Sequence, residues 1–310
     1  MTGLAGLDWI AVDWGTTRLR VWAMDRAGQV LAQAASDRGI AALDGAGHEA
    51  ALLALIGGWL PDPALVQGRL PVLACGMVGS RQGWIEAPYR AVPCLPLAAV
   101  GLVAAPVADP RLAVWLVPGL MQAQAADVMR GEEVQIAGFL AAAPDFDGVL
   151  CLPGTHAKWA RISAGEVVSF QTFMTGELFA LLSERSVLRH GMAGEGWDEA
   201  AFDAGVEVAL ARPERLAARL FSIRAEGLLQ GLTPGAARAR LSGLLIGAEL
   251  AGAKPYWLGQ DVALVGAEAL TALYGRALAQ MGMQVRQCDG GTAVLAGLTA
   301  ARAILREKER

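Results

Sequence analysis

The chain opens on an apolar segment that turns back on itself. Residues 10–13 are apolar up to Asp13, a tight turn follows at 15–17, and residues 19–24 then alternate between apolar and polar positions. Strict alternation is typical of a half-buried strand. A second turn leads into residues 29–34, which predict a third strand. The pattern therefore predicts an antiparallel meander of three strands.

The same order of elements returns later in the chain. Residues 148–152 are apolar, a turn carries Gly154 and Thr155, and two further strand patterns follow at 157–162 and 166–173. Two copies of one unit in a single chain indicate a duplicated domain. The other predicted strands are 71–76, 113–118, 261–266 and 285–288, and the predicted helices are 48–59, 129–142, most of 178–245, 241–251, 267–278 and a C-terminal helix from 290.

Small residues recur in two of the predicted helices. Ala137 and Gly138 resemble Ala296 and Gly297. Small side chains allow two helices to cross closely, which would make a hinge between domains. Alternatively, alanine-rich helices carry such pairs by chance.

Composition supports a globular protein of two domains. The chain has 310 residues, of which 54% are hydrophobic and 18% charged, and its formal net charge is -4. Without a basic stripe, nucleic acid is not an expected partner. The four cysteines form no CxxC pair, which favours free thiols in a reducing compartment over a disulfide framework or a zinc site.

No targeting or membrane-spanning segment is expected. The N-terminus lacks a cationic region before an apolar run, and the uncharged residues 91–108 contain three prolines. Prolines at such spacing favour loops and short strands over a spanning helix. We therefore expect a soluble, cytoplasmic protein that does not bind membranes.

Two loops offer candidate chemistry. At the first turn, Gly15 permits close approach of a ligand, and Thr16 and Thr17 present hydroxyls and backbone N–H groups to an anion. Asp13 beside such a site would hold Mg²⁺, usually through water. The alternative is a hairpin whose carboxylate caps backbone N–H groups. A glycine-rich loop also follows the strand at 71–76, where α/β domains place ligand contacts.

Seven stretches together resemble the 2-dehydro-3-deoxygalactonokinase family of the actin-like ATPase and sugar kinase superfamily. The resemblance implies an α/β fold of two ribonuclease H-like domains with a nucleotide cleft between them. The first domain would be 1–120, with the C-terminal helix 290–310 packing back on it, and the second, nucleotide-binding domain would be 121–289. The stretches are residues 13–20, 76–80, 84–88, 129–133, 152–159, 174–177 and 241–249.

The resemblance also implies an activity. A kinase of this family transfers the ATP γ-phosphate to the 6-hydroxyl of 2-dehydro-3-deoxy-D-galactonate, with Mg²⁺ required. Two alternatives stay open: a kinase of another 2-keto-3-deoxy sugar acid, and a non-enzymatic ATP-binding sensor. The expected partner is a small sugar acid, and the oligomeric state is not predicted.

Nucleotide contacts are assigned to three places by the resemblance. The first turn would bind the β- and γ-phosphates, the second turn would hold them from another side, and Gly266 with the following helix would pack on adenine and ribose. Lys158 would neutralise phosphate charge, or it would be a solvated strand residue. For His156 the alternatives are a catalytic base, which is not usual for His in these kinases, and a polar packing role. The expected nucleotide contacts are Gly15, Thr16, Thr17, Gly154, Thr155, Lys158, Gly266, Ala267 and Thr271.

Phosphoryl transfer also needs a base and an acceptor site. The resemblance places the base at Glu132, then Glu133, then Asp127, although both glutamates would also stabilise a helix N-terminus. The substrate carboxylate would pair with Arg81 or Arg130, and for both arginines a surface ion pair is the alternative. The expected substrate contacts are Gly76, Met77, Val78, Gly79, Ser80, Arg130, Thr175 and Glu177.

Overall fold

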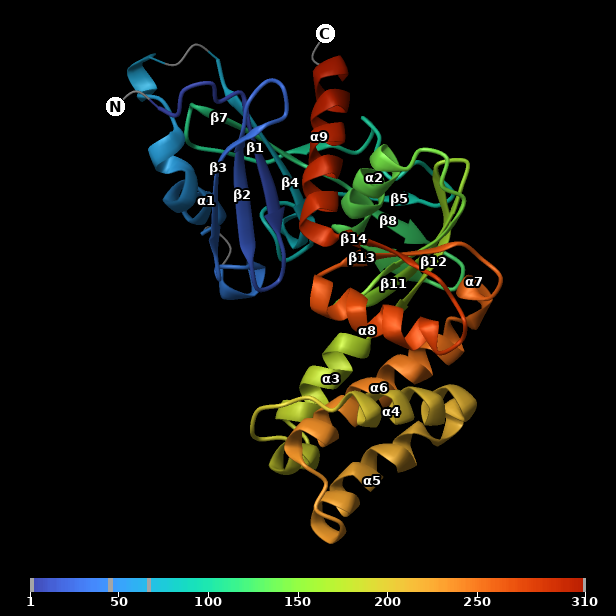
Figure 1. Cartoon of the computed structure of the whole chain (residues 1–310). Helices are drawn as coiled ribbons and strands as arrows, with labels where there is room; N and C mark the ends of the chain where they lie inside the picture. The colour runs from blue at the N-terminus through green and yellow to red at the C-terminus, as the bar shows by residue number, and fades with distance from the viewer. Residues whose placement is uncertain (1–2, 44–46, 66–67, 309–310) are drawn as a thin grey trace. The chain divides into compact units, whose positions relative to one another are not determined.

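The computed structural model describes residues 3–43, 47–65 and 68–308, and they divide into two compact units (Figure 1). Unit 1 takes in Met1–Phe146, Ser163–Ser169 and Gly290–Arg310, and unit 2 takes in Asp147–Ile162 and Phe170–Asp289. Residues 121–146 group with unit 1, whereas the predicted boundary assigns them to the second domain. The reason is the packing of one helix in this segment on the C-terminal helix of unit 1.

Unit 1 contains a six-stranded sheet of order β3-β2-β1-β4-β7-β6. β1 pairs antiparallel with β2 and parallel with β4, and β4 pairs parallel with β7. The predicted opening meander is therefore confirmed. The strands are β1 (Trp9–Trp14), β2 (Leu19–Met24), β3 (Val30–Ser36), β4 (Leu70–Gly76), β6 (Val103–Ala104) and β7 (Leu112–Leu116).

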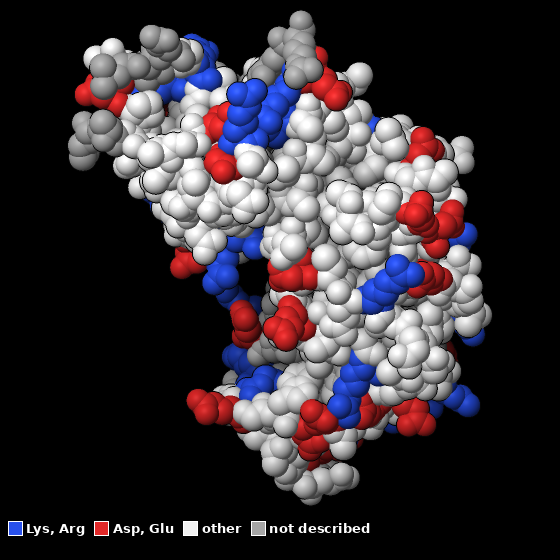
Figure 2. Space-filling model, turned by 45° about the horizontal axis from the view of Figure 1, so that its top comes forward, with Lys and Arg blue, Asp and Glu red and all other residues white. Residues whose placement is uncertain are grey.

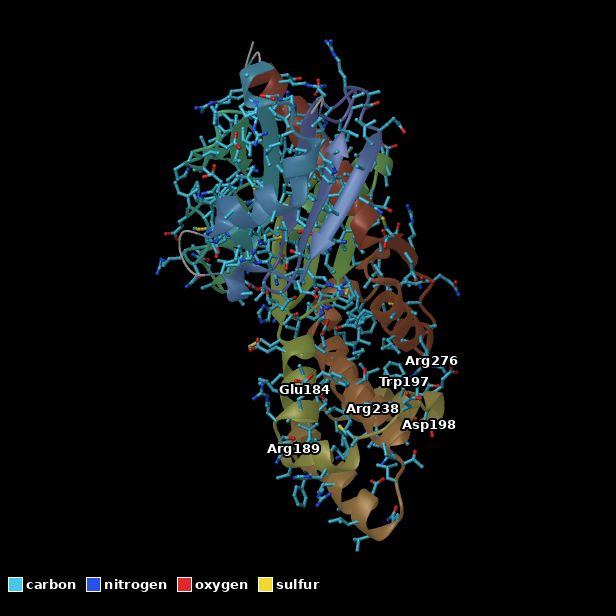
Figure 3. The ribbon with its side chains drawn as sticks, turned by 90° about the vertical axis from the view of Figure 1, so that its left-hand side faces the viewer. Glu184, Arg189, Trp197, Asp198, Arg238 and Arg276 are labelled. Carbon is cyan, nitrogen blue, oxygen red and sulfur yellow. The ribbon has the colours of Figure 1, made fainter. Side chains whose placement is uncertain are left out.

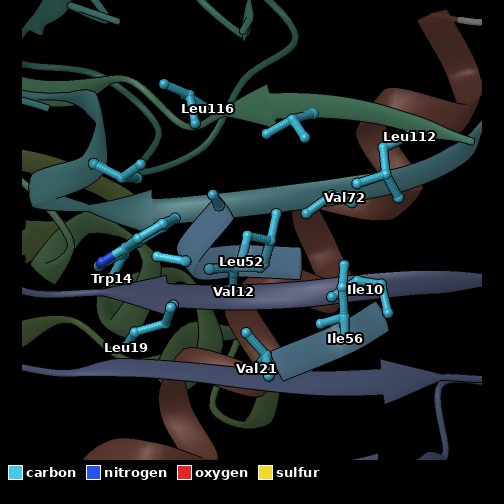
Figure 4. Close-up of a cluster of buried hydrophobic side chains, with 14 of the residues drawn as sticks. Ile10, Val12, Trp14, Leu19, Val21, Leu52, Ile56, Val72, Leu112 and Leu116 are labelled. Carbon is cyan, nitrogen blue, oxygen red and sulfur yellow. The ribbon is translucent and has the colours of Figure 1, made fainter. Parts of the chain in front are cut away.

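Both faces of this sheet are buried. On one face Ile10, Val12 and Val21 form a core with α1 (His48–Ile56), and Figure 4 shows these side chains between strand and helix. On the other face Trp9 and Trp22 pack with residues of α9 (Gly290–Lys308). Burial on two sides explains why β1 is almost continuously apolar up to Asp13. Positions 309 and 310 of the predicted C-terminal helix lie outside the described residues.

The second sheet repeats this plan. Its order is β12-β11-β10-β13-β14, with β10 antiparallel to β11 and parallel to β13, and β13 parallel to β14. The predicted duplication is confirmed, and both sheets have the strand order of ribonuclease H-like folds. The strands are β10 (Gly148–Leu152), β11 (Ala157–Ser163), β12 (Glu166–Phe173), β13 (Val262–Gly266) and β14 (Arg286–Asp289).

A small third sheet was not predicted. β8 (Gly119–Gln122) pairs with β5 (Tyr89–Ala91) and with β9 (Asp127–Met129). Strands of three or four residues are too short to show a periodicity. Because Met129 belongs to β9, the predicted helix from 129 is wrong at its start: α2 runs over Glu132–Ala142, after Gly131 adopts φ of 106°.

Helices make up most of unit 2 beyond its sheet (Figure 1). Most of the predicted helical stretch 178–245 is confirmed, and the α-helices are interrupted at 185–198, 212–215 and 230–233. α4 and α6 pack closely, and glycine is required where they meet. A Cβ on Gly243 would lie only 2.1 Å from the Phe202 carbonyl oxygen. The helices are α3 (Thr175–Glu184), α4 (Glu199–Ala211), α5 (Leu216–Leu229), α6 (Pro234–Gly252), α7 (Lys254–Trp257) and α8 (Glu268–Ala279).

The predicted crossing of small residues joins α2 to α9. A Cβ on Gly138 would lie 1.8 Å from the Ala293 carbonyl oxygen, and a Cβ on Gly297 would lie 1.9 Å from that of Val134. No side chain fits at either position, so the small residues are required rather than accidental. Both helices belong to unit 1, so the expectation that this crossing joins two domains is wrong.

The surface and the thiols agree with the composition. On the face in Figure 2, lysine and arginine are interspersed with acidic side chains among broad uncharged areas. All four cysteines are free thiols, as predicted. Within residues 3–43, 47–65 and 68–308, no helix combines the length and the hydropathy needed to cross a bilayer.

The crossing gives a stability prediction. Gly297→Ala should destabilise the protein by about 2 kcal/mol or more, because the helices must separate to admit the methyl group. The matched control is Gly227→Ala in α5, where a Cβ meets nothing within 4 Å. That change should raise stability, by up to about 1 kcal/mol, through helix propensity alone. Urea unfolding measures both, and equal stabilisation by the two variants would contradict the tight crossing.

Candidate active site

The carboxylate at the end of β1 is held by an arginine of the neighbouring strand. Asp13 and Arg20 are opposite each other in the β1–β2 register. Arg20 Nε donates to Asp13 Oδ2 at 3.0 Å, and Arg20 Nη2 donates to the same oxygen. The Cys75 thiol lies 3.8 Å from Asp13 Oδ1. Asp13 therefore keeps one oxygen with only a weak thiol contact.

The turn after β1 is closed and anchored. Gly15 N–H donates to the Arg18 carbonyl at 2.8 Å. The backbone N–H groups of Ile40 and Ala41 donate to the carbonyls of Gly15 and Thr16. Thr16 and Thr17 are exposed at the tip. The hydroxyls assigned to phosphate binding are thus accessible on a fixed backbone.

The ends of β4 and the start of α2 touch beside this turn. A Cβ on Gly131 would lie 3.3 Å from Gly76 Cα, and a Cβ on Gly76 would lie 2.8 Å from the Trp14 carbonyl oxygen. Both glycines have positive φ, 90° at Gly76 and 106° at Gly131. Glycine adopts such angles without steric cost, which lets the three segments converge.

The two glutamates that open α2 have different surroundings. Glu132 is half-buried, and its Oε2 accepts the Arg130 N–H at 3.0 Å. Glu133 is fully buried, and its Oε2 accepts the Gly131 N–H at 2.7 Å. Burial, followed by the charge of Glu132, raises the pKa of Glu133 to about 8. Glu133 is therefore protonated at neutral pH and is a poor proton acceptor there.

The third carboxylate, Asp127, lies at the start of β9. Its Oδ1 accepts the N–H of the neighbouring Val128 at 2.8 Å, and Asp127 pairs with Gln122 of β8. Asp127 thus belongs to the β8–β9 hairpin, whereas Glu132 and Glu133 stand at the first turn of α2.

The loop after β4 is compact and largely buried. Met77–Gly79 forms a 3-10 helix in which Val78 joins the hydrophobic core, and Ser80 is buried as well. The Arg130 guanidinium packs against this loop: a Cβ on Gly79 would lie 2.9 Å from Arg130 Nη1. Within residues 76–80, the candidates for polar contact with a ligand are therefore the backbone and the Ser80 hydroxyl.

Arg130 is held from two further sides. It is 9% exposed, its Nη2 donates to the Ala87 carbonyl at 2.7 Å, and its guanidinium carbon lies 4.3 Å from the centre of the Tyr89 ring. Among the described residues, Nε and Nη1 of Arg130 and the Ser80 hydroxyl have no hydrogen-bond partner. Arg81, by contrast, is exposed and lies 3.6 Å from Glu86, as expected for a surface ion pair.

In unit 2, the second turn is braced by the start of α3. Glu177 N–H donates to the Thr155 carbonyl at 2.9 Å, and a Cβ on Gly176 would lie 2.3 Å from the Gly154 carbonyl oxygen. His156 Nε2 lies 2.6 Å from Glu177 Oε2. Glu177, expected at the substrate, is thus engaged with the turn.

Lys158 is buried beside this turn. Its side chain is 3% exposed, and Nζ donates to the His156 carbonyl at 2.9 Å. The alternative of a solvated strand residue is therefore wrong. A buried ammonium at the base of a loop that offers backbone N–H groups suits an anion.

A buried carboxylate joins four elements around the turn. Glu249 of α6 is 2% exposed and accepts hydrogen bonds from Trp159 Nε1 at 2.7 Å, from Tyr274 OH at 2.6 Å and from the Thr175 hydroxyl. Burial raises the pKa of Glu249, and these hydrogen bonds oppose the shift. The Thr175 hydroxyl, expected at the substrate, is committed to Glu249.

An apolar pocket of about 240 Å³ adjoins the turn. It lies within unit 2 and brings together α3, α6, α8 and Trp197, which precedes α4. Its exposed wall is almost entirely carbon. The lining residues are Gly154, Thr175, Gly176, Phe179, Trp197, Ser242, Leu245, Ile246, Leu270, Leu273 and Tyr274.

The residues expected at adenine lie close to this pocket but do not line it. A Cβ on Gly266 would lie 3.3 Å from the Pro153 carbonyl oxygen and 3.5 Å from Thr271 Cγ2. Thr271 is buried and donates to the Glu268 carbonyl of its own helix. Ala267 is the exposed N-cap of α8. The part of α8 that lines the pocket is instead Leu270, Leu273 and Tyr274.

The residues that hold the site in place have weak signals in the sequence. Arg20 lies on a predicted strand, and the short turn before that strand places it opposite Asp13. Glu249 stands alone in an apolar helical run, which is itself a signal of a buried, paired carboxylate. Trp197 carried no local signal because it lies between helices.

Glu133 gives a prediction with a defined sign. A carboxyl whose pKa is raised to about 8 in the folded state holds its proton there and loses it in the unfolded chain above about 4.5. Wild-type stability should therefore fall as pH rises from 4.5 to 8, by at most about 5 kcal/mol at about 1.4 kcal/mol per pH unit.

Glu133→Gln imitates the protonated acid and should remove this contribution. Its stability relative to the wild type should rise across the same pH range, as measured by urea unfolding at pH 5, 6, 7 and 8. A constant difference between the two proteins would contradict the raised pKa.

Comparisons with known proteins cover almost the whole chain. Residues 13–301 match the family described as 2-keto-3-deoxy-galactonokinase. The chain is 40% identical over 297 residues to 2-dehydro-3-deoxygalactonokinase DgoK1 of Rhizobium meliloti (strain 1021), covering 94% of this chain and 95% of that protein. It is 36% identical over 293 residues to 2-dehydro-3-deoxygalactonokinase of Escherichia coli (strain K12), covering 94% and 96%.

A solved structure agrees. A crystal structure from Sinorhizobium meliloti, described as a 2-dehydro-3-deoxygalactonokinase, superposes with a TM-score of 0.85 at 39% identity, covering 96% of this chain and 99% of that one. The match spans both units and both sheets. The chain therefore belongs to the 2-keto-3-deoxy-galactonokinase family.

Proposed function

We propose that this protein transfers the γ-phosphate of ATP to the 6-hydroxyl of 2-dehydro-3-deoxy-D-galactonate. The observation that carries the proposal is family membership over residues 13–301, together with relatives of that name at 40% and 36% identity. The cytoplasm is the compartment proposed for the reaction, because ATP is the donor.

The nucleotide contacts are proposed for both turns. The exposed Thr16 and Thr17 would bind the β- and γ-phosphates in unit 1. In unit 2, Gly154 and Thr155 would bind phosphate oxygens through the backbone, and the buried Lys158 would neutralise charge. The apolar pocket that borders Gly154 would take the base, since its volume of about 240 Å³ suits a flat ring.

Asp13 is the proposed magnesium residue. Mg²⁺ in kinases is held by one or two carboxylates, with waters and substrate phosphates completing its shell. Asp13 fits this role because its Oδ1 meets only a thiol at 3.8 Å, while Arg20 fixes the other oxygen. Within the described ranges no cluster of three His, Cys, Asp or Glu side chains could bind a metal by itself. The ion would neutralise phosphate charge when bound.

Glu132 is the proposed base. It stands at the first turn of α2, is half-buried rather than enclosed, and is oriented by the Arg130 N–H at 3.0 Å. Its neighbour Glu133 holds a proton at neutral pH because its pKa is raised to about 8. A carboxylate that accepts the hydroxyl proton as the oxygen attacks contributes typically 10²–10⁴-fold to the rate. Loss of the Glu132 carboxylate should therefore slow the reaction by about that factor.

The acceptor would bind beside the loop after β4. The backbone of Gly76–Gly79, the Ser80 hydroxyl and Arg130 are the proposed contacts. Buried Nε and Nη1 groups without a partner among the described residues favour Arg130 over the exposed Arg81 for the substrate carboxylate. Thr175 and Glu177 are kept only as indirect contributors, since Glu249 and His156 engage their side chains.

A substrate panel tests the reaction. ADP release should require Mg²⁺ and should be stimulated by 2-dehydro-3-deoxy-D-galactonate well above its 2-dehydro-3-deoxygluconate epimer. Strong stimulation by another acid alone would transfer the activity to that substrate. ATP binding without stimulation by any 2-keto-3-deoxy acid would favour a nucleotide sensor.

Substitution tests the base. Glu132→Gln should lower kcat by about 10²–10⁴-fold, because the acceptor proton has no carboxylate to receive it, with the KM for ATP within about threefold of the wild type. Glu268→Gln is the matched control: it removes an exposed carboxylate from the first turn of α8 and should leave kcat unchanged. An active Glu132→Gln enzyme beside an inactive Glu133→Gln enzyme would assign the base to Glu133.

A further inference from the structure

The apolar pocket in unit 2 carries few groups that can distinguish one base from another. Four of its lining residues have a polar side-chain group: Thr175, Tyr274, Ser242 and Trp197. Two of the four hydroxyl or N–H groups are already used. Thr175 and Tyr274 both donate to Glu249, the latter at 2.6 Å.

The remaining two groups discriminate poorly. A serine hydroxyl both donates and accepts, so Ser242 can pair with the 6-amino group of adenine or with the 6-oxo group of hypoxanthine. An indole N–H only donates, so Trp197 can pair with ring nitrogens that both bases share. The rest of the exposed wall is almost entirely carbon.

Hydrogen bonds from α6 hold the segment that leads to Trp197. Arg238 of α6 donates through Nη1 to the Met192 carbonyl at 2.6 Å and through Nη2 to the Gly196 carbonyl at 3.0 Å. Figure 3 labels Arg238 and Trp197 within the helical part of unit 2. The Trp197 ring also lies 5.8 Å from that of Phe202. A preorganised aromatic wall binds any flat base by contact.

We propose that the donor base is held by apolar contact and stacking, with no hydrogen bond that distinguishes adenine from hypoxanthine, so that the enzyme uses inosine triphosphate within about tenfold as well as ATP. Glu249 acts as a positioning residue that withdraws the hydroxyls of Thr175 and Tyr274 from the pocket. This inference rests on the proposed function only in taking a nucleoside triphosphate as donor.

The expected selectivity between the two triphosphates depends on whether the site hydrogen-bonds the base. A site that hydrogen-bonds its ligand rejects an analogue lacking that group by about 10⁴–10⁵-fold, whereas an apolar pocket discriminates by about 10–200-fold at most. Hypoxanthine has nearly the shape of adenine and differs at the 6-position and in the proton on N1. Comparing the two triphosphates therefore isolates hydrogen-bond readout from shape.

The experiment compares kcat/KM for ATP and inosine triphosphate with the sugar acid, and their Kd values by calorimetry without it. A ratio under about 10 in favour of ATP supports the proposal, and a larger ratio overturns it. If no sugar acid is phosphorylated with either nucleotide, the proposed function fails, while the Kd ratio still decides the inference.

Two variants test the assigned geometry. Tyr274→Phe should leave the ATP-to-inosine ratio within about threefold, since its hydroxyl faces Glu249; a change above tenfold would show that this hydroxyl reads the base. Trp257→Phe is the matched control, because it also removes a buried hydrogen bond to α6, at 2.8 Å from Leu250, without lining the pocket.

Trp197→Ala should weaken both nucleotides by the same factor, about tenfold, because stacking is indifferent to the base. Unequal losses would overturn the proposal. A melting temperature for each variant confirms that the ratios come from folded protein.

Discussion

Burial of the central strands on both faces is the constraint on which the other features depend. β1 is enclosed between the α1 core and the α9 core, and β10 is enclosed in unit 2. Polar side chains are excluded along such strands, so polar chemistry is concentrated where they end. Asp13 stands at the end of β1, and the turn with Gly154 follows β10. The same constraint thus produced the apolar pattern and the location of both candidate sites.

The enclosed carboxylates show how partners decide the role of one chemical group. Asp13 meets a guanidinium, Glu249 meets three neutral donors, and Glu133 lies fully buried beside the charge of Glu132. Burial disfavours the charged form of a carboxyl and hydrogen bonds donated to it oppose that effect, so burial raises the pKa of Glu249 while its three donors act against the rise. The pKa of about 8 at Glu133 follows from burial first and from the charge of Glu132 second.

The sequence alone predicted the parts of the fold whose residue pattern repeats with a clear period. Both meanders, the helical stretch and the crossing at Gly138 and Gly297 follow from alternation, helical spacing and small residues. The third sheet could not be found because its three- and four-residue strands have no period. The start of α2 was misplaced because Met129 and Arg130 are good helix formers, and the break depends on the backbone of Gly131.

For the candidate site, local motifs indicated the loops but not their supports. Asp13, Gly154 and Glu132 stand in recognisable turns, whereas the contacts of Glu249 join residues 25 to 90 positions apart in sequence. No local pattern encodes such pairing. Lys158 illustrates the same limit: its strand position allowed either burial or solvation, and only packing decided for burial.

The hydrogen bonds of unit 2 explain why few polar groups are left for a ligand. An enclosed carboxylate without partners would be strongly unfavourable, so Glu249 requires several donors. Two of its three donors, Thr175 and Tyr274, also line the pocket. Satisfying Glu249 therefore consumes hydroxyls that would otherwise face the pocket. Selectivity for one base would require a new polar group on the pocket wall. That group would reduce the apolar area in contact with the base. Stability of the buried carboxylate and selectivity of the pocket thus compete for the same side chains.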